Sequence, residues 1–289
     1  VYTVTVGGTG ILTPVSTTFT YTPDKGDSGS PGGYVPILTP DDDPGEVDIN
    51  KPVLNTETGE AVTSLTENAI AQAFEEVTPD DSGVKTVTVN IPAIAGANAY
   101  VFELPAKVLD LETNDLIELT TEIATITLPT NMLAKSELAN VGNIELVILA
   151  ADTSGLAEDA KAQIGDRPII DIYFRVDGTA VLWSDPKVSV NVSIPYSSPE
   201  NEDSEKIVVW YIDDNGDVVP VFSGRYNSST ETVSFTTAHL SRYAVAYVDI
   251  TFEDISDYGW AKREIEVLAS KGIIKGTSTA RKVFGPSAN

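Results

Sequence analysis

Carboxylates are abundant among the groups in this chain that could do chemistry, with 43 Asp and Glu against 18 Lys and Arg. Glu75-Glu76 and the set Glu200, Glu202 and Asp203 could in principle supply the acid and base of glycoside hydrolysis. That reaction needs two carboxyl groups that face each other across a cleft. Nothing in the sequence brings such a pair together, so we assign no catalytic carboxylates.

Two acidic runs have the composition of calcium ligands. Asp213-Asp214-Asn215-Gly216-Asp217 alternates its side chains, but a calcium loop of the helix–loop–helix kind has Gly at its sixth position and Glu at its twelfth. Gly216 is fourth, so we favour a hairpin turn. Asp41-Asp42-Asp43 lacks a ligand spacing as well and is typical of a solvated linker. With one His and no Cys, the chain also lacks the residues of a zinc, thiolate or disulfide site, so we expect neither a metal nor a cofactor.

His239-Leu240-Ser241 is a third candidate for chemistry. It is similar to the His-x-Ser/Thr cleavage sites of autoproteolytic β-sandwich domains. The resemblance implies attack by the Ser241 hydroxyl on the Leu240 carbonyl, with His239 as the base and a strained turn as the driving force. The same three residues fit a turn in which ring and hydroxyl cap backbone groups before a final strand, and we favour that interpretation.

The composition indicates a globular chain. Hydrophobic residues make up 42% of its 289 residues, enough to build one large core or two ordinary ones. No apolar run approaches the roughly 18 residues that span a membrane. The chain begins at Val1 without a signal-peptide pattern, so we expect a piece of a longer or processed protein. The absence of cysteine favours a bacterial surface protein over a secreted eukaryotic one.

The charge is unevenly distributed. The formal net charge is −25, which disfavours nucleic acid and anionic membranes as partners. Residues 251–289 nevertheless hold six basic and five acidic side chains. This segment alone is electrostatically permissive towards an anionic polymer, although a helix with charges on its wet face would have the same composition.

Hydrophobic periodicity divides the chain into four parts. Residues 1–22 read as a hairpin, either the end of a preceding domain or edge strands, and residues 23–50 as a linker rich in Pro, Gly and Asp. Residues 51–248 form a β-rich body, and residues 249–289 form a small helical segment. The turn dipeptides Asp177-Gly178 and Asn215-Gly216 are typical of hairpins.

The body contains many short strands separated by turn signals, which predicts a largely antiparallel β-sandwich with a few short helices. One helix should follow a capping box over Ser64–Glu67, and a weaker one should cover 156–164. Beside a hairpin over 53–62, the predicted strands are 85–91, 100–104, 123–128, 144–150, 169–176, 180–182, 187–194, 207–212, 218–222, 232–236 and 243–248.

The C-terminal part has the most specific pattern. Asp254 and Ser256 precede an apolar stripe at helical spacing, formed by Trp260, Ala261, Ile265, Leu268 and Ala269. Gly272 should end the helix, Ile273 and Ile274 should fold back on the stripe, and Gly276 should allow another turn. Phe284-Gly285-Pro286 follows. The pattern resembles the S-layer homology motif, which ties bacterial surface proteins to the cell wall.

The resemblance implies binding to a secondary cell wall polysaccharide at the surface of a Gram-positive bacterium. Asp254, Trp260 and the Gly272–Gly276 turn with Lys275 would shape the groove. Two features depart from the family. The chain stops at Asn289, before the Ile-Thr-Arg-Ala-Glu-like run whose Arg usually contacts the polymer, and one motif is present where three usually assemble. An unpaired anchor helix with an apolar stripe predicts self-association between chains.

The body resembles, more loosely, the β-rich modules that precede such motifs, through Val192–Tyr196, Val209–Asp213 and Phe235–Val245. We therefore expect a non-catalytic spacer that holds upstream modules of the same protein away from the wall, in the extracellular S-layer. Two alternatives are self-cleavage between Leu240 and Ser241, and a carbohydrate-binding module that presents Trp183 or Tyr211. Trp210 shares a strand face with Val208, which favours a core position for that ring.

Overall fold

The computed structural model describes residues 2–6, 15–19, 45–47, 49, 51–134, 136–277 and 283–285. The chain divides into two units, residues 1–40 and 41–289. In the first unit, β1 (Tyr2–Val6) pairs with β2 (Val15–Phe19) as an antiparallel hairpin. Both strands lie within the hairpin that the sequence predicts for residues 1–22. Most of the predicted linker, including Asp41–Asp43, lies outside the described residues, as do Arg281, Lys282 and Pro286.

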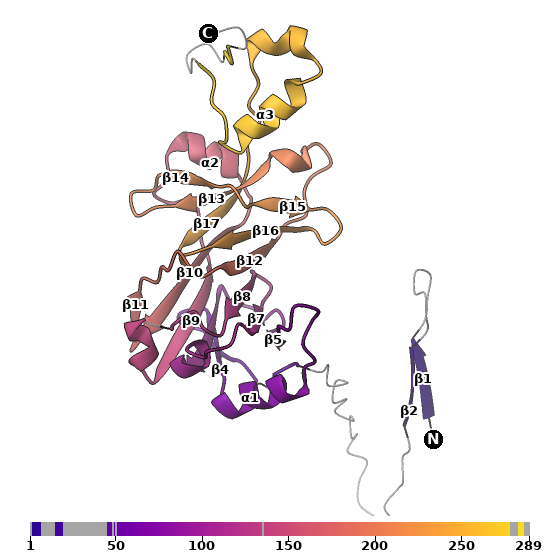
Figure 1. The fold of residues 1–289 in the computed structure, drawn as a ribbon, viewed down its shortest axis with the longest axis vertical. Coiled ribbons are helices and arrows are strands. Elements are labelled where there is room, and N and C mark those ends of the chain that lie inside the picture. The colour runs from indigo at the N-terminus through magenta and orange to yellow at the C-terminus, as the bar shows by residue number, and fades with distance from the viewer. Residues whose placement is uncertain are drawn as a thin grey trace, which may run out of the picture. The chain divides into compact units, whose positions relative to one another are not determined.

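The larger of the two sheets in the second unit contains nine strands among the described residues (Figure 1). They are β3 (Val53–Asn55), β4 (Glu60–Ser64), β6 (Ala99–Pro105), β9 (Asn143–Ala150), β10 (Ile169–Val176), β11 (Thr179–Val181), β13 (Ile207–Ile212), β14 (Val218–Val221) and β17 (Arg242–Tyr247). Their order is β14-β13-β17-β10-β9-β6-β4-β3, with β11 beside β10. The edge strands β3 and β14 are short, and β14 carries Pro220, features that protect a sheet edge from pairing with another chain.

The smaller sheet has six strands in the described part of the chain. They are β5 (Thr86–Asn90), β7 (Leu116–Thr120), β8 (Thr125–Pro129), β12 (Val190–Pro195), β15 (Arg225–Asn227) and β16 (Thr232–Thr237), in the order β15-β16-β12-β8-β7-β5. Most neighbouring strands in both sheets are antiparallel, but β4 pairs with β6 and β5 pairs with β7 in parallel. The fold is mainly β with a few short helices, as the sequence predicts.

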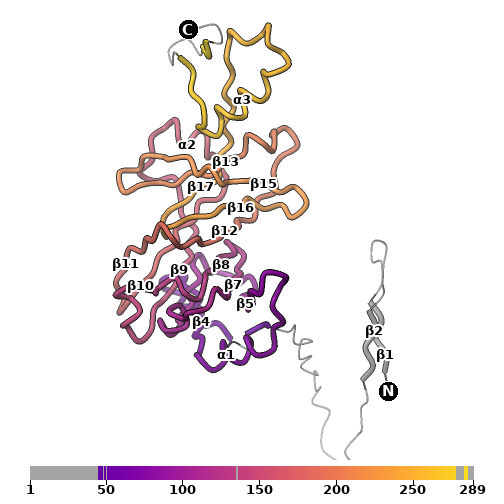
Figure 2. The backbone as a smooth tube through the Cα atoms, in the orientation of Figure 1, coloured from indigo at the N-terminus to yellow at the C-terminus, as the bar shows by residue number. Residues whose placement is uncertain are grey.

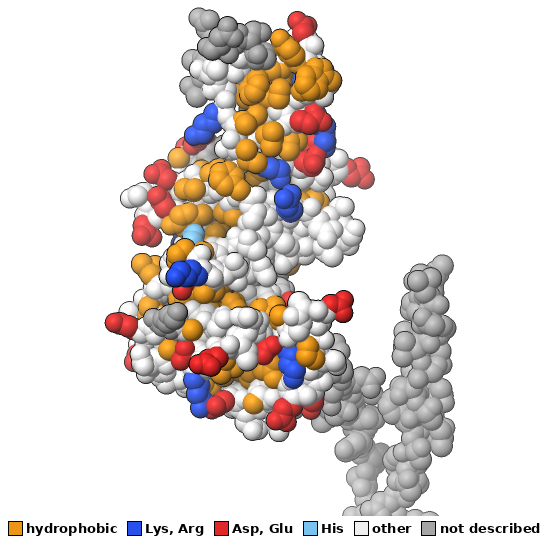
Figure 3. Space-filling view, in the orientation of Figure 1, with side chains coloured by type: hydrophobic (Ala, Val, Ile, Leu, Met, Phe, Trp, Pro, Cys, Tyr) orange, Lys and Arg blue, Asp and Glu red, His pale blue; other side chains and the backbone are white. Residues whose placement is uncertain are grey.

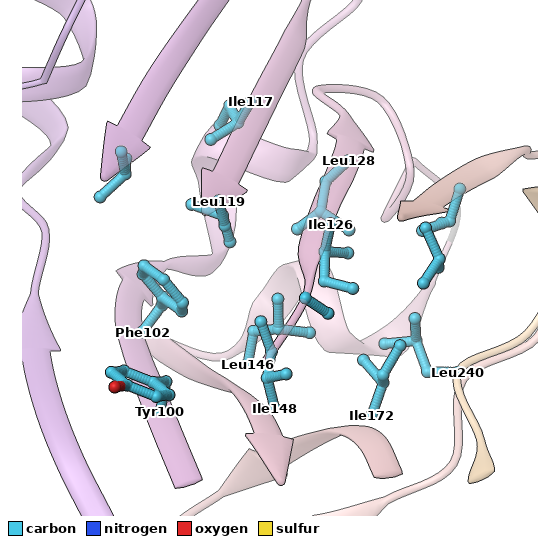
Figure 4. Close-up of a cluster of buried hydrophobic side chains, with 14 of the residues drawn as sticks. Tyr100, Phe102, Ile117, Leu119, Ile126, Leu128, Leu146, Ile148, Ile172 and Leu240 are labelled. Atoms are coloured by element: carbon cyan, nitrogen blue, oxygen red, sulfur yellow. The ribbon is translucent and has the colours of Figure 1, made fainter. Parts of the chain in front are cut away.

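The main core lies between the two sheets. Alternate residues of each strand point inward, so that one face of each sheet is apolar. Figure 4 shows side chains of both sheets directed toward one another, with Phe102 and Leu146 from the larger sheet and Leu119 and Ile126 from the smaller. All four are fully buried. This packing of two apolar faces is what makes the body a sandwich.

Three α-helices and four 3-10 helices are present among the described residues. They are α1 (Glu67–Glu76), α2 (Glu158–Ile164), α3 (Lys262–Ser270), η1 (Ala106–Leu109), η2 (Glu137–Asn140), η3 (Ser204–Lys206) and η4 (Glu253–Tyr258). Ala160 and Ile164 of α2 cover part of the outer face of the larger sheet, where they bury Trp210 and Ala244 in a second apolar cluster. Trp210 therefore occupies the core position that the sequence predicts.

The structure differs from the predicted elements in a few places. Strands β7 and β15 were not predicted. The predicted capping box over Ser64–Glu67 is wrong in register, because Ser64 still belongs to β4. Helix α1 begins one residue after Thr66, whose hydroxyl accepts the N–H of Ala69 at 3.2 Å. The predicted hairpins at Asp177-Gly178 and Asn215-Gly216 are confirmed.

Candidate functional site

The C-terminal segment, residues 249–285, has a small core of its own. Phe252, Ile255 and Ala269 are buried in it, with Ile265 and Phe284 packed against them. The rings of Phe252 and Phe284 are 5.4 Å apart. Figure 2 shows the segment continuing from β17 at one end of the body. Helix α3, the turn after it and the returning segment at Phe284 thus close on one another around two aromatic rings.

Asp254 holds this closure together. Its carboxylate accepts the backbone N–H groups of Phe284 at 2.8 Å and of Gly285 at 2.7 Å. Burial would raise the pKa of Asp254, but these two donors outweigh burial and lower the pKa below its ordinary value. The sequence placed Asp254 at a helix N-cap and in a binding groove. In the structure it belongs to η4 and fastens the returning segment at Phe284 and Gly285.

The predicted N-cap and apolar stripe need correction. Helix α3 begins at Lys262, and its N-cap is Ala261 without a side-chain hydrogen bond. Trp260 precedes the helix and is 84% exposed, and Leu268 is 38% exposed. The stripe is therefore divided: Ile265 and Ala269 face the small core, whereas Trp260 presents its ring to solvent.

The two glycines of the turn allow close approaches. Gly272 has φ = +72°, a conformation that suits glycine, and a Cβ there would lie 2.7 Å from Pro220 Cγ in β14. Gly276 does not have positive φ, but a Cβ there would meet the Val283 carbonyl oxygen at 2.5 Å. Of the two isoleucines, Ile274 packs on the small core as predicted, whereas Ile273 is 51% exposed.

A cavity of about 520 Å³ separates the segment from the outer face of the larger sheet. Trp210 and Pro220 line it from the body, and Gly272, Lys275 and Gly276 line it from the segment. Figure 3 shows hydrophobic side chains gathered over the segment and the adjacent part of the body. Neither Asp254 nor Trp260 is among the lining residues of this cavity, so the five predicted binding residues do not converge on one cavity.

Ion pairs join the segment to the body. The Lys206 ammonium lies 2.5 Å from Asp249 and 3.6 Å from Glu266, and the Lys206 and Glu266 side chains are only 10% and 9% exposed. Burial would lower the pKa of Lys206, but the two carboxylates outweigh it and raise the pKa. Arg263 of α3 pairs with Asp203 and Glu205 next to η3. Local sequence patterns do not predict these ion pairs, because the paired residues are up to 60 positions apart.

His239 and Ser241 lie in the turn before β17. Tyr243, fully buried, donates its hydroxyl to the His239 carbonyl at 2.8 Å and lies 3.2 Å from His239 Nδ1. This contact resembles the tyrosine corner of Greek-key sandwiches, in which a buried tyrosine donates its hydroxyl to the backbone a few residues upstream. In the described residues no hydrogen bond joins the His239 ring to Ser241, and neither Leu240 nor Ser241 has positive φ.

The other candidate residues, Trp183, Tyr211 and Glu202, take part in packing or hydrogen bonds within the body. Trp183 is 5% exposed in the main core, and Tyr211 packs against His239 at 4.7 Å. Glu202 binds Arg167 and accepts the hydroxyl of Tyr196 at 2.7 Å.

Asp213 accepts the backbone N–H groups of Asn215 and Asp217, both at 2.9 Å, which fixes the β13–β14 turn. No group of three or more potential metal ligands occurs among the described residues.

Comparison with known proteins gives one partial match. No protein-family model matches the chain. Over 109 residues it is 33% identical to an amylopullulanase from Thermoanaerobacterium thermosulfurigenes. The matched stretch is 37% of this chain and only 6% of the amylopullulanase. In the part of the chain that the structure describes, no helix has the length and apolarity needed to cross a bilayer.

Proposed function

We propose that this chain is a non-catalytic module of an extracellular bacterial surface protein. Its β-rich body acts as a spacer, and its C-terminal segment binds an anionic polysaccharide of the Gram-positive cell wall. The observation that carries the proposal is the closed unit of residues 249–285, in which Asp254 fastens the returning segment at Phe284 and Gly285 while Trp260 stays 84% exposed. The exposed indole before α3 and the turn with Lys275 after α3 suit contact with sugar rings and acidic substituents at separate points along a polymer.

The charge distribution and the partial relative support the same proposal. The acidic body repels an anionic polymer, so binding is directed to the C-terminal part, where residues 251–289 hold six basic against five acidic side chains. The name amylopullulanase denotes an enzyme that acts on glucans, and a small part of that protein is similar to this chain. An accessory module of a larger carbohydrate-related surface protein fits a match that covers so little of the enzyme.

Co-sedimentation of the chain with Gram-positive wall sacculi tests the proposal. We expect binding to native sacculi and loss of binding after acid extraction of the wall polysaccharide. Trp260→Ala should weaken binding by at least about tenfold, since exposed aromatic rings dominate such contacts. Val53→Ala is the control, because Val53 is also exposed, at 69%, but lies in β3 at the opposite edge of the larger sheet from β14. Equal binding by Trp260→Ala and the unmodified chain would refute the role of Trp260.

A further inference from the structure

A second cavity, of about 470 Å³, opens on the outer face of the larger sheet beyond α2. It lies where β10 changes its partner. Strand β10 pairs with β17 only through Ile169–Asp171, and with β11 only through Phe174–Val176. Between these two ladders the Ile172 N–H donates to the Ser241 carbonyl at 3.0 Å. Tyr173 pairs with Val147 of β9 on one side of β10 and has no paired residue on the other among the described strands. The groove therefore arises from the change of pairing partner along β10.

The floor of this groove carries polar groups with unused hydrogen-bonding capacity. Arg242 and Asp171 pair across it at 3.1 Å, and their side chains remain 37% and 22% exposed. The hydroxyls of Tyr173 and Ser241 also line it, and neither has a hydrogen-bond partner among the described residues. Burial raises the pKa of Tyr173, so its hydroxyl stays protonated as a donor.

Two loops form a fixed rim. A Cβ on Gly216 would lie 2.7 Å from the Gly155 carbonyl oxygen, so the β13–β14 turn touches the loop before α2. The Asp213 carboxylate is occupied by backbone N–H groups of its own turn, which leaves the exposed Asp214 as the acidic group at the mouth. Leu182, directly after β11, also lines the groove and is 87% exposed.

We propose that this groove binds a neutral oligosaccharide. Carboxylate acceptors, a guanidinium fork and free hydroxyls on one floor match the alternating donors and acceptors of sugar hydroxyls, and Tyr173 and Leu182 supply apolar contact for ring faces. Asp171, Asp213 and Asp214 outnumber Arg242, so an anionic glycan is disfavoured here. The site lies outside the C-terminal segment, and its ligand differs in charge from the wall polymer, so it does not depend on the function proposed above.

The volume is consistent with this ligand class. Small-molecule sites usually occupy about 300–1,000 Å³, and the groove lies within that range. Its open mouth and shallow polar floor suit the end or the middle of a short sugar chain better than an enclosed apolar ligand.

Screening the full chain on an array of neutral and anionic oligosaccharides, followed by calorimetry with the best neutral glycan, tests the inference. Asp214→Ala removes a carboxylate acceptor, and Arg242→Lys replaces the planar guanidinium fork by a single ammonium, so each should weaken binding by at least about tenfold. Asp217→Ala is the matched control, since Asp217 is an exposed carboxylate of the same turn that does not line the groove.

Binding of a neutral glycan that survives Asp217→Ala and is lost in the other two variants would support the site. Binding of no neutral glycan, or equal loss in all three variants, would overturn it.

Discussion

Replacing Lys206 by Met tests whether buried charges fix the C-terminal segment to the body. The Glu266 side chain is 9% exposed, and one of its carboxylate oxygens already has no hydrogen-bond partner in the described structure. Loss of the Lys206 ammonium leaves that carboxylate with Lys262, 4.0 Å away and half exposed. Breaking a buried pair costs about 3–5 kcal/mol, but the 3.6 Å separation and the remaining lysine reduce the expected cost to about 2–3 kcal/mol.

The second partner of Lys206 adds little to this figure. Asp249 is 52% exposed and can be hydrated when the lysine is removed, so its pair is worth about 0–1 kcal/mol. Since one tenfold change corresponds to about 1.36 kcal/mol, the local opening of α3 should become about 30- to 150-fold more frequent. Hydrogen exchange measured by mass spectrometry on peptides of α3 and of the smaller sheet reports this opening directly.

Two further variants give the test its control. Lys262→Met should change α3 exchange less than threefold, because its pair with Glu266 is long and solvated. Adding Glu266→Gln to Lys206→Met should recover much of the lost protection, because it removes the unpaired buried charge. Unchanged α3 exchange in Lys206→Met would refute the reasoning. Equal acceleration in both sets of peptides would refute it too, since the lysine would then stabilise the body as a whole.

Three other changes have expected outcomes. Tyr243→Phe removes the hydroxyl that the His239 carbonyl accepts, and it should lower the free energy of unfolding by about 1–2 kcal/mol in urea titrations; an unchanged midpoint would contradict the corner's role. Gly272→Ala should accelerate α3 exchange, because a left-handed alanine costs about 1–2 kcal/mol and its Cβ meets β14; normal exchange would contradict this. Burial, followed by the hydrogen bond to Glu202, raises the pKa of Tyr196 from 10.0 to about 12. The contribution of the neutral Tyr196 hydroxyl to the free energy of unfolding is therefore fully present below pH 10 and is lost as the pH rises through about 12. Urea titrations of Tyr196→Phe should show a smaller loss of stability over that interval.

Most of the β body could be predicted because its strands alternate in the sequence. Strand β10 was predicted with the correct bounds, since Ile170, Ile172 and Phe174 mark its buried face. Strand β7 was not predicted, although it is as long as β5 and β8 and also alternates, with Ile117 and Leu119 buried; its parallel pairing with β5 leaves no hairpin turn before it in the sequence. Strand β15 has only three residues, too few for a periodic signal.

The C-terminal segment illustrates where spacing alone fails. Trp260 falls at helical spacing with Ala261 and Ile265, but Ala261 has φ = −117° and ψ = −4°, which ends the preceding turn before α3 begins. Tyr258 accepts the Ala261 N–H at 2.8 Å, so η4 and α3 are separate elements. The ring thus leaves the apolar face and becomes solvent-exposed. Helical spacing in the sequence indicates which apolar residues could share one face of a helix. The backbone conformation between them decides whether each side chain is buried on that face or exposed to solvent.

The ion pairs of Lys206 and Arg263 hold the C-terminal segment against the body, and this attachment bears on both proposed binding sites. The outer face of the larger sheet carries α2 and the segment at one end and the polar groove beyond α2, so one continuous sheet supports both sites. The chain leaves β17 at Tyr247, and two residues later Asp249 is tied to Lys206 beside η3. A pull on the segment is therefore transmitted to η3 as well as through the single backbone connection. Such a joint would hold the neutral-glycan groove at a constant orientation to the wall, as a spacer that presents a binding site requires.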